Sequence, residues 1–99
     1  MLTMHPGEFL KLSFVERKRI SPAEIARRAN VSVEEIEDLL EERADLSPEL
    51  AVRLSYVIGA SPEAWTHMQA YHNLRKALVA FDPEGLEPFD FAPHARKAA

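Results

Sequence analysis

The fold is decided by residues 21–36, which read SPAEIARRANVSVEEI. Ser21 and Ser32 each precede a run of helix-forming residues, and a serine in that position accepts a hydrogen bond from an amide of the first helical turn. Asn30 tolerates the left-handed backbone conformation in which many helices end. The stretch therefore predicts a short helix that stops before Asn30 and a second helix that starts after Ser32.

Glutamates stand three residues after both serines, at Glu24 and Glu35. This is the spacing of a capping box, in which each side chain satisfies the backbone amide of the other residue. The Ser-Pro pair at Ser21 recurs at Ser47 and Ser61, and proline suits the first position of a helix because it has no amide hydrogen to satisfy. We expect five helices, which cover residues 7–19, 23–29, 33–42, 48–58 and 62–80.

Three apolar residues are spaced to fasten the two short helices at a steep angle. Ala26 lies midway along the first, where a small side chain lets the second helix cross closely, and Val31 and Ile36 fill the angle. This pattern fits a helix–turn–helix, although a plain helical bundle can produce it by chance. A helix–turn–helix would leave residues 32–38 projecting outward from the body.

The composition predicts one small globular domain. The chain has 99 residues, of which 46% are hydrophobic and 28% charged, enough for a single core. Cysteine is absent, which excludes a disulfide framework, a thiolate zinc site and a cysteine nucleophile. The N-terminus lacks the regions of a signal peptide, and no apolar run approaches the ~20 residues that span a bilayer. We therefore expect a cytoplasmic protein with no membrane partner.

The residues that catalysis would need are poorly arranged. Ser21, Ser47 and Ser61 are explained as helix caps, and no histidine and aspartate are placed to activate them. His67 and His72 are five residues apart, so they do not share a helix face as a metal-binding pair four apart would. We expect no enzymatic activity, no cofactor and no metal site; a small metal-dependent hydrolase has no support beyond scattered histidines.

The net charge of −4 is unevenly distributed. Residues 1–30 carry +3, residues 31–46 carry −6 and residues 47–99 carry −1. An acidic total argues against a general nucleic-acid coat protein, whose affinity comes from neutralising phosphates, but not against a site-specific binder. Any functional interpretation must explain the acidic block.

The character of the sequence changes after residue 80. We divide the chain into a helix–turn–helix domain over 1–80 and a proline-rich tail over 81–99, because the prolines forbid a continuous helix. The tail contains three prolines and three phenylalanines: Pro83, Pro88, Pro93, Phe81, Phe89 and Phe91. The rings either fold back onto the domain or dock on a partner, since small domains rarely leave three aromatics in water.

A stripe of larger side chains lies on the last predicted helix, and its members are Trp65, Met68, Tyr71 and His72. The stripe either packs against the first and fourth helices or places one flank against its copy in a two-fold dimer. We assign Trp65 itself to the core.

Separated motifs in a fixed order connect this chain to a known family. They are HPGEFL at residues 5–10, the Ala26…Ile36 unit, Leu46-Ser47…Ala51…Arg53-Leu54, and SPEAW…MQ at residues 61–69. Over residues 5–76 the sequence resembles the HigA-type antitoxins of bacterial toxin–antitoxin modules, within the lambda-repressor-like (XRE) helix–turn–helix family. The resemblance implies an all-α domain of five helices, a homodimer, repression of its own operon through operator DNA, and a cognate toxin partner that cleaves mRNA.

In such folds the second helix of the motif enters the major groove, and its first residues reach base edges. Four residues occupy the corresponding positions here: Ser32, Glu34, Glu35 and Asp38. Arg43 in the following loop is the candidate for a phosphate contact, and Arg27, Arg28 and Lys18 are further candidates.

This groove-facing helix is acidic where relatives usually carry basic or amide residues, and Pro22 stands where they often have glutamine. Glutamate can only accept hydrogen bonds, as from a cytosine amino group, and carboxylates are repelled by phosphates. Three explanations stay open: a solvated surface, a face that holds a basic ribonuclease toxin, and DNA binding that prefers cytosine and depends strongly on salt. Our main hypothesis is an antitoxin that also represses transcription. The alternative is a protein–protein interaction module that neutralises the toxin and has little or no affinity for DNA.

Overall fold

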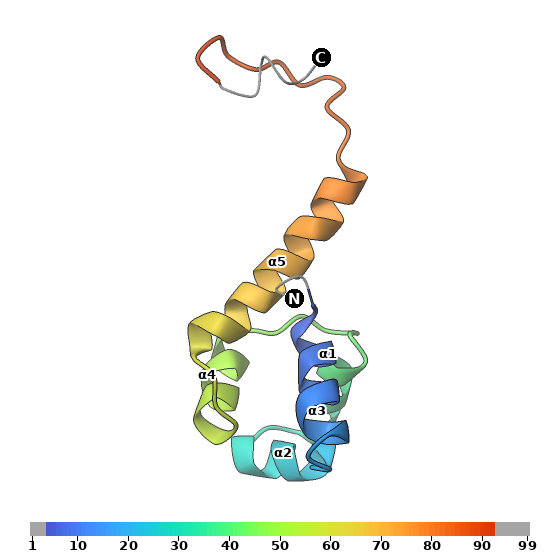
Figure 1. Ribbon diagram of the computed structural model, residues 1–99, viewed down its shortest axis with the longest axis vertical. Coiled ribbons are helices and arrows are strands. Elements are labelled where there is room, and N and C mark those ends of the chain that lie inside the picture. Colours follow the sequence, from blue (N-terminus) through green and yellow to red (C-terminus); the bar gives the residue numbers. More distant parts are fainter. Residues whose placement is uncertain (1–3, 93–99) are drawn as a thin grey trace.

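The computed structural model describes residues 4–92, and over this range the chain is all-helical, as predicted (Figure 1). The elements follow one another as α1 (Pro6–Leu10), the π-helical segment η1 (Lys11–Glu16), α2 (Pro22–Ala29), α3 (Val33–Leu40), α4 (Pro48–Val57) and α5 (Pro62–Ala80). Together, α1 and η1 form one rod, which corresponds to the first predicted helix.

The predicted serine caps are confirmed. The hydroxyl oxygens of Ser21, Ser32 and Ser47 each accept from the amide three residues later at 3.1 Å, and that of Ser61 does so at 3.0 Å. The capping box is only half formed at Ser21. The Glu24 carboxylate turns away from Ser21 and accepts hydrogen bonds from two arginines of its own helix.

The first helix is capped by a histidine. His5 is buried, and its Nδ1 accepts from the Gly7 amide at 2.9 Å. The His5 ring also meets the His72 ring of α5 edge-on, with centroids 4.8 Å apart. An accepting Nδ1 carries no proton, and burial lowers the pKa of His5, so the ring is neutral at pH 7. His5 therefore stands at the start of the first helix as its N-cap.

Two helices end at least two residues earlier than predicted. The first rod ends at Glu16 rather than Arg19, and α3 ends at Leu40 rather than Glu42. Arg19 and Glu42 adopt the left-handed conformation, with φ of 58° and 60°, and a residue in this conformation terminates a helix. Neither is a glycine or an asparagine, the residues that usually mark such an end.

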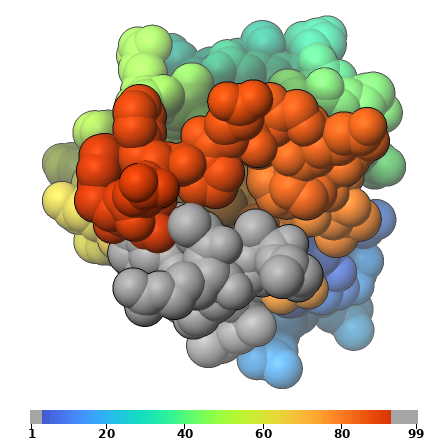
Figure 2. Space-filling model, turned by 90° about the horizontal axis from the view of Figure 1, so that it is seen from above, coloured from blue at the N-terminus to red at the C-terminus, as the bar shows by residue number. Residues whose placement is uncertain are grey.

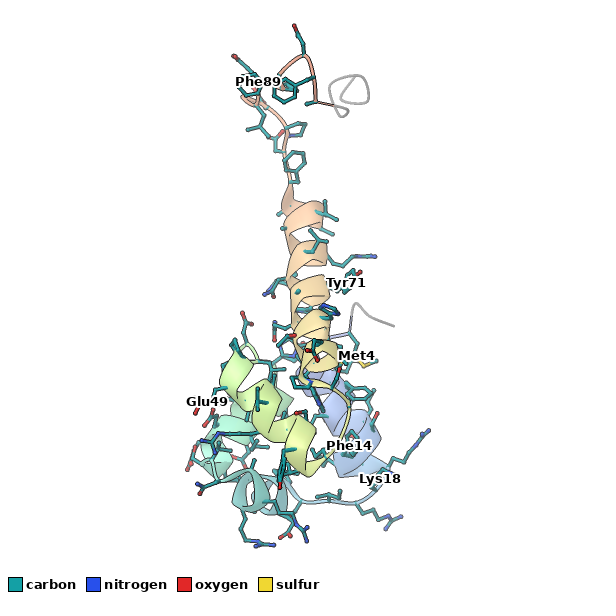
Figure 3. The ribbon with its side chains drawn as sticks, turned by 90° about the vertical axis from the view of Figure 1, so that its left-hand side faces the viewer. Met4, Phe14, Lys18, Glu49, Tyr71 and Phe89 are labelled. Atoms are coloured by element: carbon teal, nitrogen blue, oxygen red, sulfur yellow. The ribbon has the colours of Figure 1, made fainter. Side chains whose placement is uncertain are left out.

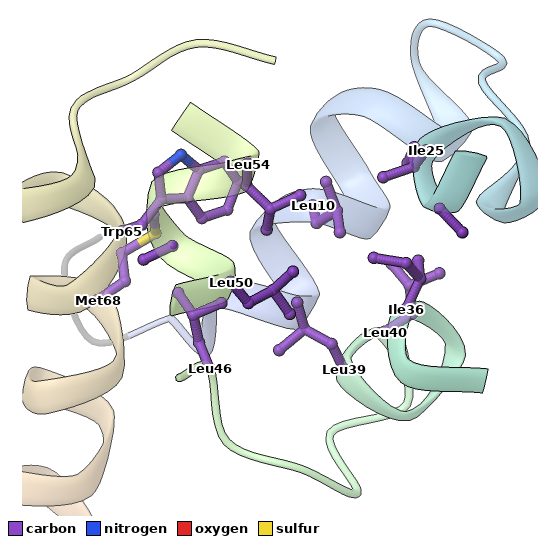
Figure 4. Packing of buried hydrophobic residues seen from close by; sticks show 12 residues of the cluster. Leu10, Ile25, Ile36, Leu39, Leu40, Leu46, Leu50, Leu54, Trp65 and Met68 are labelled. Atoms are coloured by element: carbon purple, nitrogen blue, oxygen red, sulfur yellow. The ribbon is translucent and has the colours of Figure 1, made fainter. Parts of the chain in front are cut away.

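One hydrophobic core connects the helices (Figure 4). Its members are Leu10, Ile25, Ala26, Ile36, Leu39, Leu40, Leu46, Leu50, Ala51, Leu54, Trp65 and Met68. Phe9 and Phe14 pack partly buried against this core. Trp65 is fully buried, as predicted; its Nε1 donates to the Gly59 carbonyl at 2.9 Å, and its ring meets that of Phe9 at 5.4 Å. The buried indole therefore keeps a hydrogen-bond partner.

Helix α5 extends well beyond the body on which it packs. Its first half buries Trp65 and Met68, whereas every residue over 73–80 is exposed and this half projects from the body (Figure 1). The molecule is correspondingly elongated, at 53 × 22 × 21 Å. Residues 81–92 continue from α5 as a tail without helix or strand, and Figure 2 looks down the long axis onto this end.

One of our two predictions for the tail aromatics, that they fold back onto the domain, is wrong. Phe81, Phe89 and Phe91 are 58%, 71% and 82% exposed, and the last two rings stack on each other with centroids 5.1 Å apart. Docking on a partner stays a prediction. So does the division at residue 80, although α5 does end there.

Pro93 lies outside the described residues. Across residues 4–92, no helix is both long and apolar enough to cross a membrane.

Candidate nucleic-acid interface

Helices α2 and α3 meet through the residues that the sequence predicted. Ala26, Ala29 and Ile36 are at most 4% exposed, so α2 presents small side chains where α3 crosses it. Val31 in the turn is half-buried against the core. The Ala26–Val31–Ile36 unit of the helix–turn–helix is therefore confirmed.

Backbone hydrogen bonds define the turn between these helices. Asn30 is left-handed, with φ 59° and ψ 49°. The Val31 amide donates to the Ala26 carbonyl at 3.0 Å, and the Asn30 amide donates to the Arg27 carbonyl at 3.3 Å. These two bonds form a Schellman motif, which satisfies carbonyls at the end of α2. Since Ser32 then caps α3, the direction of the second helix is set by local bonds.

Arg53 of α4 holds the end of α2 from outside the motif. Its Nη1 donates to the Ala29 carbonyl at 2.9 Å and to the Asn30 carbonyl at 3.4 Å, and its Nη2 lies 3.3 Å from a carboxylate oxygen of Glu49. Carbonyls at a helix C-terminus lack intrahelical partners and form the negative end of the helix dipole, so a guanidinium there is favourable. Sequence reasoning missed this positioning role, although Arg53 belongs to the motif that carried the family resemblance.

Helix α5 fixes the loop that follows α3. Gln69 is buried; its Oε1 accepts from the Leu46 amide at 2.7 Å and its Nε2 donates to Asn73 Oδ1 at 3.1 Å. Leu46 is itself a core residue. The end of α3 and the start of α4 are therefore held against α5, which keeps the helix–turn–helix in a constant position on the domain.

Helix α3 buries one face and presents the other. The side chains on the presented face are acidic: Glu34, Glu35, Glu37 and the half-exposed Asp38. Ser32 is exposed at the N-cap, where its hydroxyl accepts from the Glu35 amide at 3.1 Å. The structure thus places the four predicted groove-facing residues at the accessible start of α3. Their contact with bases stays a prediction.

Arg43, the predicted phosphate contact, lies in the loop after α3 and is paired with Asp38. Its Nε and Nη2 are both 3.0 Å from Asp38 Oδ1. The side chains of Arg43 and Asp38 are 60% and 47% exposed, and ion pairs this accessible contribute little stability. Arg43 can therefore turn to a phosphate, but it must first leave a carboxylate.

The two arginines at the end of α2 share one carboxylate. Arg27 Nη2 and Arg28 Nε each lie 2.6 Å from Glu24 Oε2. Hydrogen bonds from Arg27 and, second, from Arg28 hold the pKa of Glu24 at about 2, so this carboxylate is ionised at neutral pH. Arg27 and Arg28 are thus partly neutralised where the sequence had suggested phosphate contacts.

Comparison with known proteins places this geometry in a family. No family model matches the chain. The uncharacterized HTH-type transcriptional regulator YddM of Escherichia coli K12 is 35% identical over 77 residues, which cover 78% of this chain and 81% of YddM. The structure of the Pseudomonas aeruginosa antitoxin HigA with the higBA promoter is similar with a TM-score of 0.74, at 33% identity over 79% of this chain and 85% of HigA. The structure of antitoxin GraA gives a TM-score of 0.82, at 30% identity over 90% of this chain and 99% of GraA.

The chain belongs to the HigA-type antitoxins of the helix–turn–helix family. This assignment confirms the resemblance and the predicted fold class of an all-α helix–turn–helix domain. The relatives compared above are two antitoxins and an HTH-type transcriptional regulator. Within residues 4–92, no group of three or more His, Asp or Glu side chains is placed to hold a metal ion.

Proposed function

We propose that this HigA-type protein is the antitoxin of a type II toxin–antitoxin module and represses its own operon by binding operator DNA. One observation carries the proposal. A Schellman turn and a serine cap fix the start of α3 at the surface, and the chain is 33% identical to an antitoxin whose structure was solved with its promoter. In helix–turn–helix proteins this end of the second helix reaches base edges in the major groove. The proposed reading residues are Ser32, Glu34, Glu35 and Asp38, with Arg43 as a phosphate contact.

The acidic face of α3 sets the kind of operator that we expect. A carboxylate accepts from an amino group in the major groove, most typically N4 of cytosine and otherwise N6 of adenine, and it offers nothing to guanine, which presents only acceptors there. Reading by Glu34 and Glu35 therefore favours cytosine at the contacted positions. Because these carboxylates also repel phosphates, affinity must come from cations elsewhere and will fall steeply as salt rises.

We further propose that the protein is a homodimer. Tyr71, Leu74 and Leu78 are spaced three and four residues apart on α5, the last two on its projecting half, and each is at least 43% exposed. This is the spacing of a helix–helix seam, and a second copy of the same stripe would cover it. A two-fold dimer presents two helix–turn–helix units to a pseudo-palindromic operator.

The toxin that we propose as the protein partner is a ribonuclease that cleaves mRNA. Proteins that grip RNA are cationic, and the acidic block of this chain suits such a partner. Both partners, operator DNA and toxin, would be met in the bacterial cytoplasm.

Titration against DNA tests the proposed function. The purified full chain is added to a labelled duplex of the sequence upstream of its own reading frame, and to a scrambled duplex of equal length, at several salt concentrations. Selective binding with a log–log salt slope of several units supports operator recognition. A lack of selective binding even at low salt would refute it.

A second function is favoured by the charge of α3. Glu34, Glu35 and Glu37 are exposed, and Arg43 is already paired with Asp38, so the presented surface is anionic. On this alternative the protein neutralises a basic toxin and has little or no affinity for DNA. Co-expression with the product of the adjacent reading frame separates the two: co-purification without DNA selectivity leaves only the neutraliser.

A further inference from the structure

A run of three cations lies in the loop between η1 and α2. Arg17, Lys18 and Arg19 are all exposed, and no carboxylate of residues 4–92 comes within ion-pair distance of any of them. The arginines of α2 and of the loop after α3 differ, because each is paired with an acidic side chain. The loop therefore carries the cations of this region that can bind another anion without first breaking an ion pair.

The loop is fixed to the domain and adjoins the helix–turn–helix. Ile20 packs against the core, and its amide donates to the Phe14 carbonyl of η1 at 3.2 Å. The next residue, Ser21, is the N-cap of α2. Figures 1 and 3 place α2 and Lys18 at the end of the molecule opposite the tail. The three cations thus sit on an anchored backbone beside the element that would meet DNA.

The backbone at Arg19 adopts an unusual conformation. Its φ of 58° is left-handed, a conformation that glycine adopts readily and that costs a side-chain-bearing residue stability. Strain of this kind tends to occur at functional positions. Glu42 and Ala60 share this conformation, so at Arg19 it supports a use for the side chain together with the unpaired charge of the loop.

We propose that Arg17, Lys18 and Arg19 are the main phosphate contacts of this helix–turn–helix. The inference rests on the proposed operator binding. DNA affinity needs cations that neutralise phosphates, and the presented face of α3 supplies carboxylates instead. In this proposal α3 contacts the bases, and residues 17–19 contact phosphates and contribute affinity that does not depend on the DNA sequence.

A charge-matched comparison tests this inference. The variant Arg17→Ala/Lys18→Ala and the control Arg75→Ala/Lys76→Ala each remove two exposed cations, but the control pair lies on the projecting half of α5. Binding of the upstream duplex and the scrambled duplex is measured by fluorescence anisotropy across a salt series. We expect the log–log slope of the loop variant to fall by about 0.9 for each phosphate that it no longer neutralises. The preference for the upstream duplex should stay as in the wild type, and the control should keep the wild-type slope.

The outcomes separate this inference from the proposed function. A loop variant with the wild-type salt slope overturns the inference while leaving operator binding intact. Equal reductions of the slope in the loop variant and the control also overturn it, because net charge alone would then account for the effect. If the wild-type chain binds neither duplex, operator binding itself fails and the inference fails with it.

The substitution Arg19→Gly should change thermal stability and DNA affinity in opposite directions. Glycine relieves the left-handed backbone, so the melting temperature should rise by a few degrees. The same change removes one cation from the phosphate-binding run, so the salt slope should fall by about 0.9 and affinity for both duplexes should drop. A purely structural role for Arg19 predicts unchanged affinity in a stabilised protein, and that result would exclude Arg19 from phosphate binding.

Discussion

The absent side chain of Gly7 lets α1 rest on the backbone of Leu39 in α3. A Cβ atom at Gly7 would lie 1.8 Å from the Leu39 carbonyl oxygen and 2.8 Å from its carbonyl carbon. The obstacle is buried backbone, which cannot move aside as the end of a flexible side chain can. The first helix therefore holds the groove-facing helix through a contact that only glycine permits.

We expect Gly7→Ala to lower the free energy of unfolding by about 3 kcal/mol, because α1 must move off α3 to admit the methyl group. Urea unfolding followed by circular dichroism measures the change. Gly85→Ala is the control outside the core: a Cβ there meets nothing within 4 Å, and the cost of its left-handed φ of 87° falls on the tail rather than on the packing of α1 against α3. Equal stability of Gly7→Ala and the wild type would show that the close approach does not constrain the fold.

The stability of the protein should fall on mild acidification because of His5. Burial lowers the pKa of His5 below its ordinary 6.5, so the unfolded chain takes up a proton first as the pH falls. The contribution of His5 is complete above pH 6.5 and is lost as the pH falls from there toward the folded-state pKa. The loss is at most about 1.4 kcal/mol per pH unit.

Urea unfolding of the wild type and of His5→Asn, each at about pH 7.5 and about pH 5.5, isolates this effect. Asparagine can still cap the helix but does not titrate, so the variant should lose less stability between the two pH values. The other histidines are common to both proteins. Parallel pH dependences would contradict the assignment to His5.

Gln69→Met should destabilise the protein by about 2 kcal/mol, because the Leu46 amide is left buried without an acceptor. The change conserves volume and removes only the amide group. Asn73→Ala serves as the control: it breaks the hydrogen bond from Gln69 Nε2 at the exposed edge but leaves the Leu46 bond in place. We expect a much smaller effect from the control in thermal unfolding. Equal effects would place the stabilisation at Asn73 instead.

Glu34→Gln should change base preference. Glutamine can bond an adenine at two points, whereas a glutamate accepts from cytosine, so selection from a randomised duplex pool should shift from cytosine toward adenine at one position. Glu63→Gln makes the same charge change in the first turn of α5 and should leave the preference unaltered. An unaltered preference in Glu34→Gln would remove Glu34 from the reading residues.

Leu74→Glu/Leu78→Glu should convert the proposed dimer to a monomer, since two carboxylates would enter the seam on the projecting half of α5. Sedimentation equilibrium of the full chain gives the mass. Val52→Glu/Tyr56→Glu is the control; it places the same two charges at the same spacing on exposed apolar positions of α4. A wild type that is already monomeric, or a variant that stays dimeric, would exclude this seam.

Helix starts could be predicted from the sequence because their cause is local. Ser21, Ser32 and Ser47 each bond an amide three residues away, and that distance is visible in the sequence. The turn between α2 and α3 was predictable for the same reason, since Asn30 is a residue that tolerates the left-handed conformation. Once these helix starts and this turn were located, the groove-facing residues could be assigned from their positions at the start of the second helix of the motif.

Other features depend on contacts that no local pattern encodes. Arg53 reaches the carbonyl of Ala29 across 24 positions, so its role appears only once α4 lies beside α2. Arg19 and Glu42 end helices in a conformation that their side chains do not favour, which hid those boundaries. The pairing of Arg43 with Asp38 was equally hidden, because it depends on how the chain turns after α3.

The elongated shape has a consequence for how ligands combine on this chain. The helix–turn–helix and the aromatic tail occupy opposite ends of a molecule 53 Å long (Figure 1). A DNA duplex bound at the helix–turn–helix end would leave the tail accessible, so DNA and a protein partner could bind simultaneously without steric conflict. In that arrangement the protein would connect the two ligands, and binding at the tail need not displace the DNA.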